Sequence, residues 1–211
     1  MYNDFVKDWL PYLEVNMFAR EDVMKWQNEV CADLMRRSGI REGDTVIDFG
    51  CGRGHYAFAA AIAVGNTGTV YGLDTNEAVL EVLKQDAEYR HCTNVIAVKT
   101  EPGVDMPFAD SSADAVLIYD LIHETELRQP FLQEAHRVLK QGGILSVLAF
   151  HMTEQEILDM LEEVRNSGFE TYNDLEGGIH FVLDKAASNQ REDISLLEHG
   201  IIHNFRSVKI Q

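Results

Sequence analysis

Long hydrophobic runs are absent from this sequence, and so is the leader of a secreted protein. None of its 211 residues belongs to an apolar stretch of about 18 residues, the length that spans a bilayer. The first eight residues lack the basic and then apolar segments of a signal peptide. These absences predict no membrane insertion and a cytoplasmic location.

Cysteine is scarce, and its copies are far apart. Cys31, Cys51 and Cys92 are an odd number with no C-x-x-C pair, which argues against a disulfide framework and a zinc knuckle. We expect ordinary small side chains in the core. No cluster of residues has the spacing of metal ligands, so no metal site is predicted.

Basic side chains are few as well. There are 18 Lys and Arg residues against 35 Asp and Glu residues, a formal net charge of −17. A field of that sign repels phosphate backbones, and Arg36-Arg37 is the only local basic patch. The composition disfavours a nucleic-acid partner and suits an uncharged or cationic small molecule.

Strand-like and helix-like segments alternate along most of the chain. The length suits one well-cored domain, and the alternation predicts an α/β fold with a mostly parallel sheet. Strands are expected at 45–49, 69–73, 94–98, 115–119 and 144–149. Helices are expected at about 20–37, 56–64, 76–89, 128–139 and 153–167.

A glycine-rich turn follows the first expected strand. Residues 45–49 are an apolar, β-branched run, glycines stand at positions 50, 52 and 54, and a buried helix begins near Tyr56. Such a turn lets backbone approach a ligand and directs free helix N–H groups at it. The dinucleotide pattern G-x-G-x-x-G would need glycine where His55 stands, so a nicotinamide cofactor is the weaker interpretation.

Two motifs carry a family resemblance. Asp48-x-Gly50-x-Gly52-x-Gly54 resembles the first motif of class I S-adenosylmethionine-dependent methyltransferases. The run Glu-Ala-His-Arg-Val-Leu-Lys-Gln-Gly-Gly over residues 134–143 resembles a later one, especially in the branch of ubiquinone and menaquinone biosynthesis. Its double glycine is expected to end a helix in a tight turn.

The resemblance covers about residues 25–185 and implies a Rossmann-like, doubly wound, mostly parallel sheet. Seven strands are implied, the last one antiparallel, with helices on both faces. Also implied are S-adenosyl-L-methionine as cofactor and a small-molecule methyl acceptor. An antiparallel pair is expected at 169–172 and 179–183. We expect the chain to divide into an N-terminal helical segment and lid over 1–40, a core domain over 41–186 and a C-terminal extension over 187–211.

The cofactor residues follow from the resembling motifs. Gly50, Cys51, Gly52 and Gly54 form the cradle, with Asp48 ahead of them. Asp74, at the tip of the second strand, is placed to bind the ribose hydroxyls, and Thr75 follows it. An alternative role for Asp74 is the N-cap of the next helix.

The adenine residue is less sharply defined. The family places an acidic residue after the third strand, and Glu101, followed by Pro102, matches it. This loop is longer than the family pattern, so Asp105 remains a competitor. Asp120, after the fourth strand, is expected where the reactive methyl group would lie, at the switch in strand order.

A general base is needed only where the acceptor loses a proton. His123 and then His151 are the candidates, because each follows a strand end and imidazole titrates near neutral pH. For His123, packing at a helix start is an equal alternative. The acceptor and the oligomeric state, a homodimer included, stay open. Rival functions are a catalytically silent cofactor-binding protein and a nucleotide-dependent oxidoreductase.

Overall fold

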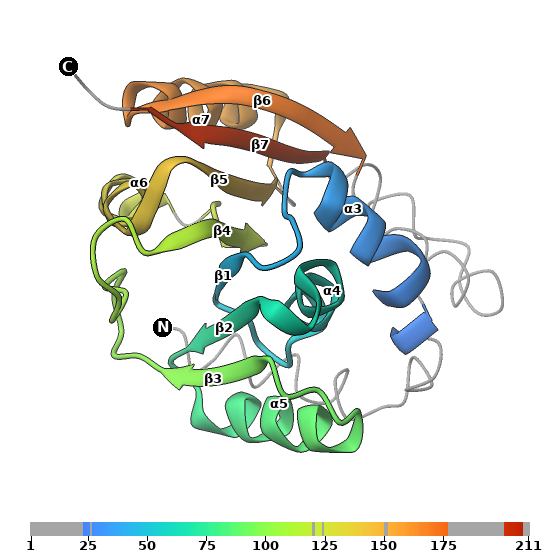
Figure 1. Ribbon diagram of the computed structural model, residues 1–211. Helices are drawn as coiled ribbons and strands as arrows, with labels where there is room; N and C mark the ends of the chain where they lie inside the picture. The colour runs from blue at the N-terminus through green and yellow to red at the C-terminus, as the bar shows by residue number, and fades with distance from the viewer. Residues whose placement is uncertain are drawn as a thin grey trace, which may run out of the picture.

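The structure is a computed structural model. It describes residues 23–25, 27–119, 121–123, 125–149, 152–176 and 201–208. One seven-stranded sheet has the order β3-β2-β1-β4-β5-β7-β6 (Figure 1). The first five strands in this order, β3-β2-β1-β4-β5, pair in parallel with one another. Strand β7 is antiparallel to both β5 and β6. This confirms the predicted doubly wound, mostly parallel sheet.

The elements begin and end near the predicted positions over most of the chain. The strands are β1 (Thr45–Phe49), β2 (Thr69–Asp74), β3 (Val95–Lys99), β4 (Ala113–Tyr119), β5 (Leu139–Ala149), β6 (Phe169–Glu176) and β7 (Ile201–Ser207). The helices are α3 (Ala32–Arg37), α4 (His55–Val64), α5 (Glu77–Tyr89), α6 (Thr125–Val138) and α7 (Glu154–Asn166), with the short turns η1 (Gln27–Cys31) and η2 (Gly65–Thr67). Among the described residues, no helix combines the length and the hydrophobicity needed to cross a membrane.

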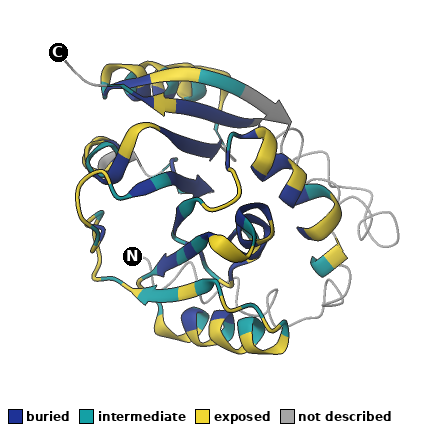
Figure 2. Ribbon diagram, viewed as in Figure 1, coloured by how far each residue is buried: buried dark blue, intermediate teal, exposed yellow. Residues whose placement is uncertain are grey.

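Helices cover both faces of the sheet. Side chains alternate along a strand, so Val46 points into the core beneath α3 and α4, whereas Ile47 points into the core beneath α6 and α7. Helix α5 packs at the β2–β3 end of the sheet, beside α4. Figures 1 and 2 show the buried central strands between these layers. The central strands β1 and β4 are largely apolar because both of their faces are covered.

The first described helical segment is not a regular α-helix. Residues 23–25 are helical, Gln27–Cys31 is a π-helical turn, and α3 follows. Gln27 is fully buried; its amide nitrogen donates to the His55 carbonyl at 2.8 Å, and its oxygen accepts from Arg90 at 2.5 Å. The predicted continuous helix over 20–37 is therefore wrong in its middle, and residues 20–22 lie outside the described part.

Strand β6 pairs with a strand from near the C-terminal end of the sequence. Strand β7, residues 201–207, lies between β5 and β6, and the predicted partner at 179–183 lies outside the described residues. Phe205 on β7 is fully buried in the core beneath α6 and α7. Part of the segment expected to be an extension thus belongs to the sheet.

The double glycine does not cap a helix. Helix α6 ends at Val138, and β5 begins at the next residue. Ala113 pairs with Leu139, but Ala115 pairs with Ile144, so residues 140–143 bulge out of the strand. Gly142 has φ +77° within this bulge, a conformation that glycine adopts without strain.

Candidate functional site

The switch in strand order lies between β1 and β4, as predicted. Strand β1 pairs with β2 on one side and with β4 on the other, so the chain leaves β1 and β4 in opposite directions. In an open parallel sheet, ligands bind in the crevice beyond the carboxyl ends of such strands. The glycine loop after β1 and the segment after β4 meet here.

The three loop glycines have different surroundings. All have positive φ: +76° at Gly50, +52° at Gly52 and +83° at Gly54. A Cβ atom added at Gly50 would collide with Leu121, and one added at Gly54 would collide with Leu83. A Cβ atom at Gly52 would meet no atom of the described residues within 4 Å. At Gly50 and Gly54 a leucine methyl group would have to move, and the positive φ strains any other residue there, whereas Gly52 borders open space among the described residues.

The end of β2 fixes the shape of this loop. The backbone N–H groups of Gly50 and Cys51 both donate to the Leu73 carbonyl, at 2.8 and 2.9 Å. The Gly52 N–H donates to Oδ2 of Asp74 at 3.0 Å. The cradle is therefore held by protein groups and does not depend on a ligand for its conformation.

Asp74 is a half-buried carboxylate beside Gly52. Its second oxygen, Oδ1, accepts from the Asn76 N–H at 2.8 Å. The N-cap of α5 is Asn76, which accepts from the Ala78 N–H at 3.0 Å, so the alternative of Asp74 as N-cap is wrong. A carboxylate has about four acceptor positions, which leaves Asp74 capacity for ligand hydroxyls. Thr75, next to it, is exposed.

Asp48 lies beneath the loop and is enclosed by protein. Asp48 is 2% exposed, and its Oδ2 atom has no hydrogen-bond partner among the described residues. Burial, and secondly the charge of Asp74, raise the pKa of Asp48 to about 7, while a backbone hydrogen bond with Ala57 acts in the opposite direction. This carboxyl group can change charge near neutral pH.

The loop that carries both adenine candidates starts at the same edge. The Thr100 N–H donates to the Asp74 carbonyl at 3.1 Å. Glu101, Pro102 and Asp105 then lie exposed, and Gly103 has φ +135° with nothing within 4 Å of an added Cβ. The structure thus brings this loop next to Asp74 and leaves the choice between Glu101 and Asp105 open.

A buried guanidinium orders the segment after β4. Arg128 on α6 is 4% exposed; its Nε donates to the Ile122 carbonyl at 3.0 Å, and its Nη1 pairs with Glu163 on α7 at 3.2 Å. His123 follows at the crevice edge and is half-buried. Asp120, His151 and residues 1–22 of the segment predicted as a lid lie outside the described part of the chain.

Two further features of the site were not predicted. The rings of Tyr56 and Tyr119 pack edge to face beside the glycine loop, with centroids 4.5 Å apart. Glu134 and Arg137 bind the loop between β3 and β4. The sequence did carry a signal for the second pair, because both residues belong to the run 134–143 that resembles a methyltransferase motif.

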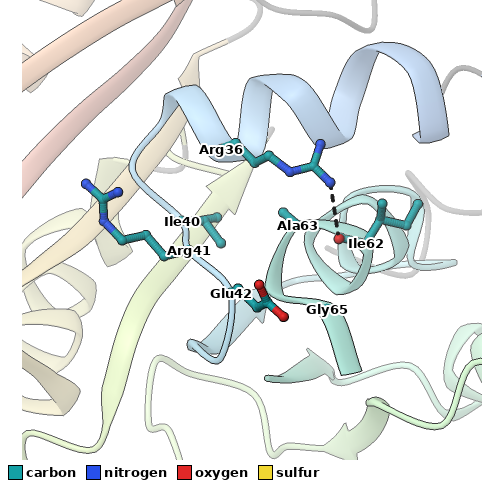
Figure 3. Close-up of a pocket in the computed structure, with 7 residues that line it drawn as sticks. All are labelled: Arg36, Ile40, Arg41, Glu42, Ile62, Ala63 and Gly65. Atoms are coloured by element: carbon teal, nitrogen blue, oxygen red, sulfur yellow. Dashed lines mark hydrogen bonds between the residues drawn. The ribbon is translucent and has the colours of Figure 1, made fainter. Parts of the chain in front are cut away.

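A separate pocket lies at the other end of the strands (Figure 3). Arg36, Arg41 and Glu42 line it, and Arg36 donates to the Ile62 carbonyl at 3.4 Å. These residues precede β1 or belong to helices, so this pocket shares no group with the glycine cradle. In the part of the chain that the structure describes, no three His, Cys, Asp or Glu side chains are grouped to hold a metal ion.

Comparison with known proteins gives a consistent result. Residues 40–198 match the family model described as a methyltransferase domain. The chain is 34% identical over 149 residues to the 2-phytyl-1,4-naphtoquinone methyltransferase of Trichormus variabilis, covering 70% of this chain and 59% of that protein. It is 36% identical over 121 residues to the demethylmenaquinone methyltransferase of Geobacillus kaustophilus, covering 57% and 50%.

The alignments therefore span between half and three-fifths of the length of these two relatives. Among solved structures, a SAM-dependent methyltransferase from Aquifex aeolicus superposes with a TM-score of 0.68 at 19% identity, covering 90% of this chain and 100% of that one. At this identity the superposition shows a shared fold.

Proposed function

The chain belongs to the methyltransferase domain family, and from that membership we propose that it is an S-adenosylmethionine-dependent methyltransferase acting on a small-molecule acceptor. The observation that carries the proposal is the open space at Gly52, next to the carboxylate of Asp74. Open space at a backbone turn among the described residues, with a carboxylate beside it, suits an adenosyl group.

The residues present fit the cofactor. The backbone at Gly52 would lie against the amino-acid part, Asp74 would accept from the ribose hydroxyls, and Glu101 or Asp105 would accept from the adenine amino group. Asp48 is enclosed, so its contribution would be its negative charge rather than direct contact. Thr75 and Pro102 flank these groups. Asp120 remains a prediction.

Bound S-adenosylmethionine supplies an electrophilic methyl group on a sulfonium that is already a good leaving group. The protein has to align the acceptor and exclude water. Phe49, Leu121 and Met152 support that role, because these half-buried apolar residues lie at the ends of adjacent strands: Phe49 is the last residue of β1, and the other two follow β4 and β5. His123, or the predicted His151, would accept a proton where the acceptor must lose one.

The apolar residues at these strand ends favour an apolar acceptor over a charged one. The two relatives are named for a naphthoquinone and for demethylmenaquinone. We therefore propose a small aromatic ring of the reduced naphthoquinone type as the first acceptor to test. The net charge of −17 likewise suits an acceptor without phosphate groups.

Calorimetric titration tests the cofactor. S-adenosylmethionine and S-adenosylhomocysteine should bind with micromolar affinity, and NAD should not bind. Methyl transfer from labelled S-adenosylmethionine to reduced naphthoquinones then tests turnover. Cofactor binding without transfer to any member of a broad acceptor panel would favour a silent binding protein, and binding of NAD alone would favour an oxidoreductase.

Asp74→Ala should weaken S-adenosylhomocysteine binding roughly 5- to 150-fold, as expected when a charged hydrogen-bond partner worth about 1–3 kcal/mol is lost. Asp74→Asn, which keeps one acceptor oxygen, should weaken binding less. The matched control is Asp44→Ala, because Asp44 also accepts a backbone N–H, from Arg41 at 2.7 Å, but lies at the amino end of β1. Equal affinities of folded Asp74→Ala and wild-type protein would exclude the ribose role.

A further inference from the structure

We propose that Glu134 and Arg137 are positioning residues for the adenine end of the cofactor site. This inference rests on the proposed function and concerns two α6 residues outside the cradle. Glu134 accepts from Arg137 through both oxygens, at 2.6 Å from Nη2 and 2.7 Å from Nε. This paired geometry fixes the plane of the guanidinium and leaves its other N–H groups for the loop between β3 and β4.

The pair binds the second half of that loop through several hydrogen bonds. Arg137 donates to the carbonyls of Met106 at 3.1 Å and Phe108 at 2.9 Å, and to the Asp110 carboxylate at 2.6 Å. The Met106 N–H donates to Glu134 at 2.8 Å. Met106 is buried, so its backbone groups have little access to water and depend on these partners.

The adenine candidates lie between two fixed points. Thr100 is held by the Asp74 carbonyl, and Met106 is held by Glu134 and Arg137. Within the described residues, no hydrogen bond joins residues 101–105 to the rest of the chain. The position of the carboxylate at Glu101 or Asp105 is therefore determined mainly by the two ends of this short span.

The hydrogen bonds that Glu134 and Arg137 make to the loop, here called the clamp, should not depend on pH in the neutral range. The hydrogen bonds from Arg137 lower the pKa of Glu134, and Arg137 stays protonated, so both groups remain charged. The ring of Phe108 also packs on Tyr71 of β2, with centroids 4.9 Å apart, which ties the same loop to the sheet. Loss of Arg137 would therefore loosen the loop without detaching it completely.

The test is discrimination between two ligands that differ at the adenine amino group. S-inosylhomocysteine carries a carbonyl in place of that amino group, so a correctly placed carboxylate should reject it. Wild-type protein should prefer S-adenosylhomocysteine at least about 10-fold. Arg137→Met should lower affinity for S-adenosylhomocysteine about 10-fold and remove most of the preference. Arg137→Lys should fall between, since an ammonium cannot reproduce the fork.

Lys140→Met is the matched control. Lys140 lies three residues after Arg137 and pairs with Asp114 at 2.8 Å; among the described residues it forms no hydrogen bond or ion pair with the loop. It should leave both affinity and preference unchanged. A double-mutant cycle tests whether Arg137 acts through the adenine carboxylate. Once that carboxylate is removed by Glu101→Gln or Asp105→Asn, Arg137→Met should cause little further loss of affinity. Asp110→Asn, at an exposed residue, gives a milder disturbance if Arg137→Met folds poorly.

Unchanged affinity and preference in folded Arg137→Met would overturn this inference and leave the proposed function intact. A preference that survived while the affinity fell would also overturn it, because the effect would then be general loss of structure. Absence of S-adenosylhomocysteine binding by the wild-type protein would instead refute the proposed function, and this inference with it.

Discussion

Replacing Gly52 with valine is expected to lower affinity for S-adenosylhomocysteine at least about 100-fold, or roughly 2.7 kcal/mol. The backbone there has φ +52°, and an added Cβ would meet no atom within 4 Å in the part of the chain that the structure describes. The valine side chain would therefore project into the space assigned to the ligand. Isothermal titration with the purified variant measures the loss.

Backbone strain has to be separated from ligand exclusion, since a non-glycine residue at positive φ costs about 1–3 kcal/mol of stability. Gly142→Val provides the control: Gly142 has φ +77°, also faces open space, and lies in the β5 bulge at the amino end of β4. Both variants should melt at similarly reduced temperatures, and only Gly52→Val should lose binding. Retained binding by Gly52→Val would place the ligand elsewhere.

Asp48→Asn should change how stability depends on pH. With its pKa raised to about 7, folded Asp48 holds a proton between pH 4 and 7 that the unfolded chain releases. The free energy of unfolding therefore falls as the pH rises through this window, by at most about 4 kcal/mol in total, and levels off above pH 7. Asparagine stays neutral, so the variant should lack this pH-dependent part of the free energy of unfolding.

Denaturant unfolding at pH 5 and pH 8 measures the difference. The wild-type protein should lose up to about 2–3 kcal/mol more than Asp48→Asn between these values. Wild-type protein should also release protons on binding S-adenosylmethionine near pH 6.5, because a bound cation favours the ionised carboxyl. Calorimetry in buffers of different ionisation enthalpy detects that release. Parallel pH profiles for the two proteins would show that Asp48 is not the titrating group.

The glycine cradle could be predicted because its determinants are local. An apolar β-branched strand, three alternate glycines and a helix lie within twenty residues, and the carboxylate at the tip of β2 follows from the same strand-helix spacing. The strand order near β1 follows from right-handed crossovers between parallel strands. These features need no information about distant side chains.

The missed features depend on distant parts of the chain. The π-helical turn at Gln27 is stabilised by Arg90, 63 positions away, and β6 pairs with a strand that begins 25 residues after it ends. Arg137 donates hydrogen bonds to backbone carbonyls about 30 residues earlier in the sequence. Backbone acceptors carry no sequence signature, so Glu134 and Arg137 could be recognised as a motif without revealing their partners.

The most direct test of the proposed site is a crystal structure of the protein grown with S-adenosylhomocysteine. Electron density for the ligand should lie beyond the carboxyl ends of β1 and β2, with the amino-acid part against Gly52 and the ribose hydroxyls on Asp74. Density in the pocket lined by Arg36 and Arg41, or a crevice filled by side chains, would contradict the assignment of this site.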